Sequence, residues 1–337
     1  LNDNQPEFSQ SIWAYVDKAA SQTRVDNGRA KYAENNTLLD QIEKQYDVPA
    51  SIVVAIWGLE STYGSFIGDY DVLSALATLG WQGRRISYGR SQLIGAMKII
   101  QNGFADRTQL KGSWAGAMGQ TQFIPTTYLD YAVDANDDGR RNLWSDLDDV
   151  FASTANYLNV SGMRAATPWG GEATLPNGFD FALVDGPMKP AVEWASLGVA
   201  TPTAAFLDRF DPNLSGRIIV PAGARGPAFF VTRSFDAILK YNRSTSYALA
   251  VGLLSDAVAG GEARVIQPWP RDDRPLTLSE RKQLQQALSD AGYEPGPIDG
   301  IIGAGTKRAL RRWQSSKGLP ADGYASAATL TQLTTLN

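Results

Sequence analysis

The eight residues GLESTYGS at positions 58–65 place an acid directly after a strongly apolar run, and this acid is the first candidate for chemistry. Helical spacing predicts that Ile56, Trp57 and Tyr63 surround Glu60. A carboxyl group beside an indole and other apolar groups loses hydration, which favours the neutral acid over the anion. Such an acid can protonate a leaving-group oxygen near neutral pH. Two interpretations stay open from this segment alone, a catalytic acid or a solvated glutamate at a helix end.

A second candidate is the loop that begins DANDDGR at position 134. Asp134, Asn136 and Asp138 occupy positions 1, 3 and 5 of an EF-hand-like calcium loop, and Gly139 occupies the sharp turn at position 6. The backbone carbonyl of Arg140 would supply the ligand at position 7. Because every candidate ligand is oxygen, calcium is favoured over a transition metal.

The loop departs from the EF-hand pattern at position 12, where Ser145 replaces the bidentate glutamate. Asp146, Asp148 or Asp149 would have to close the site instead. Asp-Gly loops are also ordinary turns, so the loop is open to a purely structural interpretation.

A third candidate is a set of aromatic and amide side chains in three separate segments: GSWAGAMGQTQF at 112–123, ANYL at 155–158 and KYNRSTSY at 240–247. Sugar sites combine aromatic faces with amide and hydroxyl groups, which is the mixture found here. The alternative is that Trp114, Phe123 and Tyr157 simply belong to the core.

Composition excludes several mechanisms. The chain of 337 residues has no cysteine and no histidine, so Ser-His-Asp and Cys-His catalysis and the usual zinc sites are impossible. A net charge of −4 gives no reason to expect nucleic acid. Neither a GxGxxG after a strand nor a GxxxxGK[ST] is present, so no nucleotide is expected. No apolar run is long enough for a transmembrane segment, and no N-terminal targeting signal is visible.

The elements that must position these residues are mostly helices. From position 5 to about 102 the pattern is helical, beginning with Phe8, Ile12, Tyr15 and Val16. Pro49 is expected in the first turn of a helix over 49–61, which delivers Glu60 at its C-terminal end. Further helices are predicted at DVLSALATLG and RRISYGRSQLIGAMKIIQNG, each closed by glycine, then from position 125 to about 133 and over 146–160.

The pattern changes between about 168 and 232, where FDFALV, VEWASLGV, GRIIVPAG and PAFFVTR are separated by Gly and Pro. These runs predict a small antiparallel sheet inserted between helices. Helical spacing resumes at 233–262, and the proline-rich stretch 263–276 is expected to be a linker. The remaining 277–337 form a compact helical module with a repeat, because each of two Asp-Gly pairs is followed by Thr at +7 and Leu at +11.

Taken together, ESTYG, GSWAGAMGQTQFIPTTYLDYAVDANDDGRRNLW, DVFASTANYL and KYNRSTSYALAV resemble the lytic murein transglycosylases of the B type, in order over most of residues 5–260. LQQALSDAGY, PIDGIIGAGTKRALRRWQ and LPADG resemble the small peptidoglycan-binding module. The resemblance implies a mainly helical α+β fold: a lysozyme-like catalytic region at 1–168 and 233–262, a small β subdomain at 169–232, a linker at 263–276 and the binding module at 277–337.

By the same resemblance, Glu60 matches the family's single catalytic acid/base. Ser113, Gln122, Tyr241 and Asn242 match positions that line the sugar site, and we expect Tyr157 to line it too. The family's calcium loop falls on Asp134, Asn136, Asp138 and the Arg140 carbonyl, closed by either Asp148 or Asp149. No cofactor is expected to be required, and calcium would be structural.

The implied reaction cleaves the bond between N-acetylmuramic acid and N-acetylglucosamine in peptidoglycan without water and leaves a 1,6-anhydro end. Glu60 would act first as acid and then as base, with help from the substrate's N-acetyl group. We expect a monomer acting on glycan strands in the Gram-negative periplasm, soluble or loosely wall-associated. The alternatives are a muramidase that hydrolyses the same bond and a non-catalytic wall-binding protein.

Overall fold

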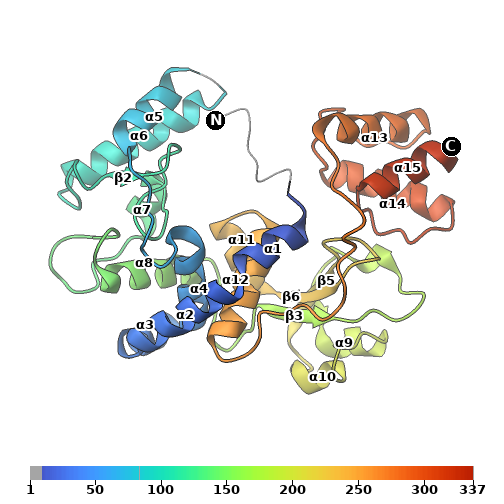
Figure 1. Cartoon of the computed structure of the whole chain (residues 1–337), viewed down its shortest axis with the longest axis horizontal. Helices are drawn as coiled ribbons and strands as arrows, with labels where there is room; N and C mark the ends of the chain where they lie inside the picture. The colour runs from blue at the N-terminus through green and yellow to red at the C-terminus, as the bar shows by residue number, and fades with distance from the viewer. Residues whose placement is uncertain (1–9, 83, 337) are drawn as a thin grey trace.

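The computed structural model describes residues 10–82 and 84–336. Figure 1 shows a helical body, a small β subdomain at one side of it, and a separate helical module that contains the C-terminus. The expected contribution of Phe8 to the first helix lies outside the described residues. Within the described part of the chain, no helix is both long and apolar enough to cross a membrane.

The helical body is built from nine helices of the described chain and a two-stranded sheet. The helices are α1 (Ile12–Ala19), α2 (Gln22–Glu34), α3 (Asn36–Tyr46), α4 (Ala50–Ser61), α5 (Val72–Trp81), α6 (Ile86–Gln101), α7 (Pro125–Tyr131), α8 (Leu147–Val160) and α12 (Thr245–Val258); the strands are β1 (Tyr70–Asp71) and β2 (Lys111–Gly112). Helix α4 packs against α12 near the centre of the body, where both are almost entirely buried. This explains why the sequences of α4 and α12 are apolar on all sides.

The predicted helices are present with small differences at their ends. Pro49 is the N-cap of α4 and not its first residue. Helix α5 is not closed by glycine, because it continues through Gly80 to Trp81. The reason is packing: a Cβ on Gly89 of α6 would collide with the backbone of Gly80, so the two glycines let α5 and α6 approach closely.

The β subdomain contains a four-stranded antiparallel sheet in the order β3-β6-β5-β4. Its strands are β3 (Gly170–Ala173), β4 (Lys189–Pro190), β5 (Ser215–Ile219) and β6 (Ala228–Thr232), and α11 (Arg233–Tyr241) follows directly and leads back to the body. Side chains of β6 alternate between two cores. Phe229 and Val231 face the body, while Phe230 packs with Ile218 beneath the short helices of the subdomain. Both faces of β6 are therefore apolar.

Two of the predicted strands are wrong. FDFALV forms a single 3₁₀ turn (Phe181–Leu183), and VEWASLGV contains helix α9 (Ala191–Ser196), with α10 (Phe206–Arg209) after it. Trp194 of α9 is fully buried, and its indole N–H donates to the Gly216 carbonyl at 2.9 Å. The alternating pattern therefore came from one apolar helix face that covers the sheet.

The stretch 263–276 is docked against the protein along its length. Backbone N–H groups of Ile266 and Gln267 donate to the Glu172 carboxylate at 2.7 and 2.6 Å. Trp269 is buried in the main core, with its ring centroid 6.3 Å from that of Trp13 and 6.2 Å from that of Phe229. This connection is a fixed strap between the two modules.

The C-terminal module consists of α13 (Leu278–Asp290), α14 (Ala304–Ser316) and α15 (Ala327–Leu336) around its own core. The repeat seen in the sequence has a shared geometry. The Gln285 side-chain oxygen accepts from Gly300 N at 2.7 Å, and the Gln314 oxygen accepts from Gly323 N at 2.8 Å. In each case a glutamine of the preceding helix fixes an Asp-Gly turn with a left-handed glycine.

Candidate active site

Helix α4 carries Glu60 in its last turn. Residues 52–58 are all buried, and the Glu43 carboxylate accepts from Ala50 N at 2.8 Å at the other end of the helix. Thr62 ends the helix in the left-handed conformation, with φ 51°. Glu60 is partly buried. The helix therefore presents a carboxyl group at the border between a dry core and an accessible surface.

The turn after Glu60 explains the glycines of GLESTYGS. A Cβ on Gly58 would lie 2.5 Å from the Tyr63 ring, so only glycine leaves room for that ring. The Tyr63 hydroxyl donates to the Arg24 carbonyl at 2.8 Å. Ser61 closes the turn, because its hydroxyl accepts from Gly64 N at 3.0 Å. Tyr63 therefore braces the helix end through Arg24, whereas the sequence placed it beside the carboxyl group of Glu60.

Gln120 connects this turn to the next segment. Its side-chain oxygen accepts from the Trp57 indole at 2.6 Å, and its amide nitrogen donates to the Trp144 carbonyl at 2.9 Å. Gly64, with φ 80°, packs directly on the Gln120 side chain, where a Cβ would collide with it. The buried amide thus holds α4 and the 113–123 segment in one register.

Tyr247 of α12 is a hydrogen-bond partner of Glu60. Its hydroxyl donates to Glu60 Oε1 at 2.6 Å. Burial, followed by the nearby charge of Glu60, raises the pKa of Tyr247 well above its usual value, so the hydroxyl stays protonated and acts as a donor. The sequence reasoning quoted KYNRSTSY but did not select this residue. The feature of the sequence that could have identified Tyr247 is its position one helical turn after Ser244, which is the N-cap of the apolar helix α12.

Tyr241 and Tyr157, two predicted site residues, lie together. Their ring centroids are 5.1 Å apart in an edge-to-face arrangement, and Phe123 lies 5.7 Å from Tyr241. The Tyr241 hydroxyl donates to the Thr121 carbonyl at 2.6 Å. Burial, with a further contribution from the Glu60 charge, raises the pKa of Tyr241. The aromatic residues therefore form one wall beside Glu60.

The other predicted contacts have different positions. Gln122 lies next to this wall, and its amide nitrogen donates to the carbonyls of Ile67 and Gly119 at 3.0 and 2.9 Å. The Ser113 hydroxyl accepts from Ala117 N at 3.0 Å and shapes its own loop. Asn242 is exposed just after α11, and its side-chain oxygen accepts from Ser244 N at 3.1 Å. The side chains of Ser113, Gln122 and Asn242 are thus each engaged with backbone groups of their surroundings.

The predicted calcium loop is held by its own backbone. Asp134 accepts from Asp138 N at 3.1 Å and from Gly139 N at 2.8 Å, and Asp138 accepts from Arg140 N at 2.8 Å. The side chain of Asn136 donates to Asp146 at 2.8 Å and accepts from Asp138 N. These oxygens belong to the ligand chemistry of a hard cation.

Of the two candidates for the closing acid, Asp149 reaches the loop. It is fully buried, and its two oxygens accept from Ala135 N at 2.7 Å and Asn142 N at 2.6 Å. At the start of α8, the backbone N–H of Asp148 donates to the Asp146 side chain. Over residues 10–82 and 84–336, no group of three or more acidic side chains is arranged to hold a metal ion. The present arrangement is therefore not a formed metal site, and no chemical step depends on it.

The site as a whole combines one carboxyl group, a phenol donor fixed to it, and a wall of aromatic and amide side chains. In the same chain, a separate small module is attached by a docked strap. This combination is typical of two-module enzymes that act on polysaccharides.

Comparison with known proteins agrees with this class. The family described as Transglycosylase SLT domain matches residues 1–256, and the family described as Putative peptidoglycan binding domain matches residues 277–333. Membrane-bound lytic murein transglycosylase B of Escherichia coli (strain K12) is 33% identical over 274 residues, which are 77% of this chain and 73% of that protein.

Two solved structures are also similar. SltB3 from Pseudomonas aeruginosa, in complex with NAG-NAM-pentapeptide, has 47% identity and a TM-score of 0.95 over 98% of this chain and 89% of that one. The Escherichia coli lytic transglycosylase Slt35, in complex with calcium, has 30% identity and a TM-score of 0.63 over 77% of this chain and 80% of that one. The chain belongs to the transglycosylase SLT family: it is a lytic transglycosylase of the B type with a C-terminal peptidoglycan-binding domain.

Proposed function

We propose that the protein cleaves the β-1,4 bond between N-acetylmuramic acid and N-acetylglucosamine in peptidoglycan and leaves a 1,6-anhydromuramic end, with Glu60 as both acid and base. The observation that carries this proposal is the contact between Glu60 and Tyr247 at the edge of an aromatic wall. A phenol that donates to one carboxyl oxygen fixes the orientation of the carboxyl group and can stabilise its anion.

In the proposed first step, the neutral Glu60 carboxyl gives its proton to the glycosidic oxygen as the bond from that oxygen to the anomeric carbon breaks. The acetamido oxygen of the same muramic residue bonds to the anomeric carbon and carries the developing positive charge. Tyr247 helps here, because its O–H stabilises the carboxylate that forms.

In the second step, the Glu60 carboxylate takes the proton of the muramic 6-hydroxyl. The 6-oxygen then bonds to the anomeric carbon, and the bond to the acetamido oxygen breaks, so no water is consumed. This step requires the 6-hydroxyl to be held close while water is kept out. Tyr247 is buried and Tyr241 is partly buried, which supports a dry site on that side of Glu60.

The sugar-lining roles of Ser113, Gln122, Tyr157, Tyr241 and Asn242 are part of this proposal. Tyr157 and Tyr241 offer aromatic edges near Glu60, and Asn242 is exposed beside them. For Ser113, its loop-shaping bonds favour an indirect role, through the position of the 112–118 loop. We also propose action in the periplasm, where peptidoglycan lies, and retain the division into a catalytic region, an inserted β subdomain, a strap and a wall-binding module.

The product distinguishes this reaction from hydrolysis. Digestion of purified peptidoglycan should release muropeptides with anhydro ends, because the 6-hydroxyl and not water attacks the anomeric carbon. Mass spectrometry of the products is the measurement. Reducing ends, heavier by one water, would assign the protein as a muramidase, and the absence of any released muropeptide would favour a non-catalytic wall-binding protein.

Removal of the C-terminal module tests its binding role. A variant that lacks 277–337 should sediment less with insoluble sacculi and should still cleave short soluble glycans, because the module has its own core and the Glu60 site lies in the helical body. Cosedimentation and a soluble-glycan assay measure the two effects. Sedimentation equal to that of the full chain would refute a binding role for the module.

We also propose that the loop at 134–140 takes up calcium as a structural ion, with Asp134, Asn136, Asp138, the Arg140 carbonyl and Asp149 as ligands. The support is the all-oxygen donor set and the reach of Asp149 into the loop. Calcium should then raise the Tm of the wild type by mass action. Asp138→Asn should abolish the shift, while Asp137→Asn, at an exposed position between the ligands, should keep it. A wild-type Tm that ignores calcium would remove the ion from the proposal.

A further inference from the structure

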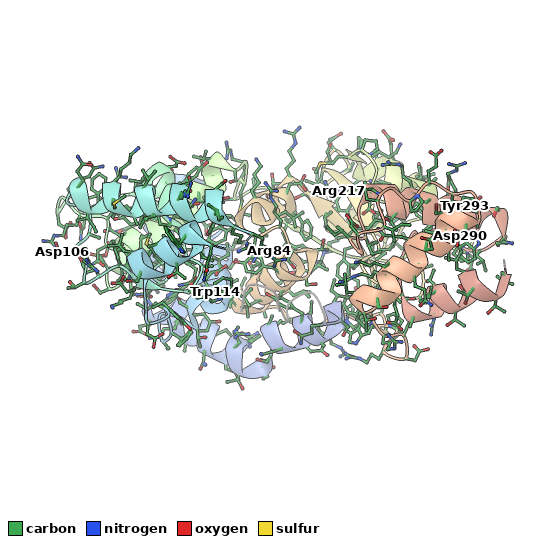
Figure 2. All side chains as sticks on the ribbon, turned by 90° about the horizontal axis from the view of Figure 1, so that it is seen from above. Arg84, Asp106, Trp114, Arg217, Asp290 and Tyr293 are labelled. Atoms are coloured by element: carbon green, nitrogen blue, oxygen red, sulfur yellow. The ribbon has the colours of Figure 1, made fainter. Side chains whose placement is uncertain are left out.

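A cavity of about 420 Å³ lies between the catalytic region and the C-terminal module, away from the contacts of Glu60. It is lined from the β subdomain by Arg217, from the start of α12 by Thr245 and Ser246, and from the module by Arg281 and Lys307. Figure 2 shows Arg217 between the body and the module, which carries Tyr293 and Asp290. Its volume is in the range of roughly 300–1,000 Å³ that is usual for ligand pockets.

Arg281 is the cation of this cavity whose hydrogen-bonding capacity is not used. Its Nε atom is buried and has no hydrogen-bond partner, and the described residues offer its guanidinium no ion pair. By contrast, Arg217 is held by Asp236, with one bond of 3.1 Å. A buried N–H donor without an acceptor is costly in a folded protein. Arg281 is only half-buried and lines the cavity, so the other N–H groups of its guanidinium are available to a ligand there.

The acids that line the cavity are already neutralised or saturated. Asp185 accepts from Arg311 at 2.9 Å and lies 3.9 Å from Lys307. Asp322 accepts from Ala224 N at 2.7 Å, and also from the Gln314 side chain and Tyr324 N. The negative charges of the lining are therefore compensated, and the uncompensated charge in the cavity is the positive charge of Arg281.

Much of the remaining lining is apolar. Ile219, Phe235 and Leu239 come from the catalytic region, and Leu276 and Ile302 come from the strap and the module. A ligand with a carboxylate at one end and small apolar groups beside it would satisfy both parts of the lining. A glycan whose muramic lactyl groups are amide-linked to peptide offers no free carboxylate of its own, whereas the short peptides that branch from it do.

The cavity is also close to the catalytic carboxyl group through one helix. Ser246 faces the cavity, and the next residue, Tyr247, donates to Glu60 from the same turn of α12. Helix α12 therefore links the cavity to the Glu60 site.

We propose that this cavity binds the carboxylate-bearing peptide of the wall polymer, with Arg281 forming a paired, two-bond contact to a carboxylate. This inference rests on the proposed function, since it takes peptidoglycan as the substrate. Arg281 is a specificity residue here, because it selects strands that carry peptides and does not touch the reacting atoms.

The test measures binding of the free tetrapeptide stem, purified from amidase-digested sacculi, to the full-length protein by calorimetry. Arg281→Met keeps most of the apolar stem and removes the guanidinium, so the Kd should rise about tenfold, as expected for loss of a charged hydrogen-bonded contact. Lys282→Ala and Arg308→Ala remove neighbouring exposed cations outside the lining and should bind like the wild type. A peptide with amidated carboxylates should bind weakly to all four proteins.

A kinetic readout separates selectivity from simple damage. The ratio of kcat/KM on peptide-bearing strands to that on peptide-stripped strands, whose freed lactyl carboxylates are capped as amides, should fall about tenfold in Arg281→Met, in line with its loss of affinity. Equal binding by wild type and Arg281→Met, equal binding of the amidated peptide, or an unchanged ratio would each overturn the proposal. Peptide binding is measured without turnover, so a protein that binds the peptide but forms no anhydro product would refute the proposed function and leave this site in place.

Discussion

Glu60→Gln should lower kcat by about 10³-fold or more, because glutamine can neither give the proton in the first step nor accept it in the second. The substitution keeps the size and shape of the side chain. The amide can still meet the Tyr247 hydroxyl, which now lies 2.6 Å from the carboxyl oxygen. Release of soluble muropeptides from purified sacculi measures the loss.

The matched control is Glu34→Gln, which removes an exposed acid of the same type at the end of α2. It should have the wild-type rate. Cosedimentation of Glu60→Gln with sacculi should also be normal, since the proposed wall-binding module is unchanged. Cleavage by Glu60→Gln at the wild-type rate would end the assignment of Glu60 as acid and base.

Tyr247→Phe should lower kcat by about 10²-fold, the usual effect of removing one donor that stabilises charge formed in the transition state. The ring stays in its buried place, and only the hydroxyl that donates to Glu60 is lost. Because the hydrogen bond is made to the reacting group and not to the sugar, KM should change much less than kcat. Steady-state kinetics on a soluble glycan measure both values.

Tyr63→Phe is the control for this variant, because it removes another buried hydroxyl close in sequence to Glu60. That hydroxyl bonds to the Arg24 carbonyl, so the loss should appear as roughly 0.5–1.5 kcal/mol of unfolding free energy and not as a loss of kcat. If Tyr247→Phe and Tyr63→Phe had equal kinetic effects, Tyr247 would have no special role at Glu60.

Much of the helical framework could be predicted from the sequence. The apolar run before Glu60 and the proline at its start indicate α4 almost to the residue, because few other structures fit a continuous apolar run of this length. The strands β5 and β6 were also predicted. Helix α9 was not, because a short amphipathic helix and a short strand give similar patterns over six residues.

The candidate site was predictable only in part, for a physical reason. Glu60, Tyr157 and Tyr241 were named from their motifs, but the partner of Glu60 comes from a residue 187 positions later. Spacing along the chain says nothing about such a contact, because it depends on how α4 packs against α12. The choice between Asp148 and Asp149 had the same difficulty, since only the direction of each side chain at the start of α8 distinguishes them.

The buried Trp269 makes the connection between the two modules fixed, and a fixed connection has a different consequence from a flexible tether. A flexible tether would let the catalytic region search a volume around each anchoring point. The effective concentration of the catalytic region at the glycan would then fall as the tether lengthens. Here the strap is fixed by Trp269 and by the bonds of Glu172. If the module captures a glycan strand, as proposed, the docked strap would hold Glu60 at one distance and one angle from that strand. Only the glycosidic bonds at that distance from the anchoring point would then be cleaved.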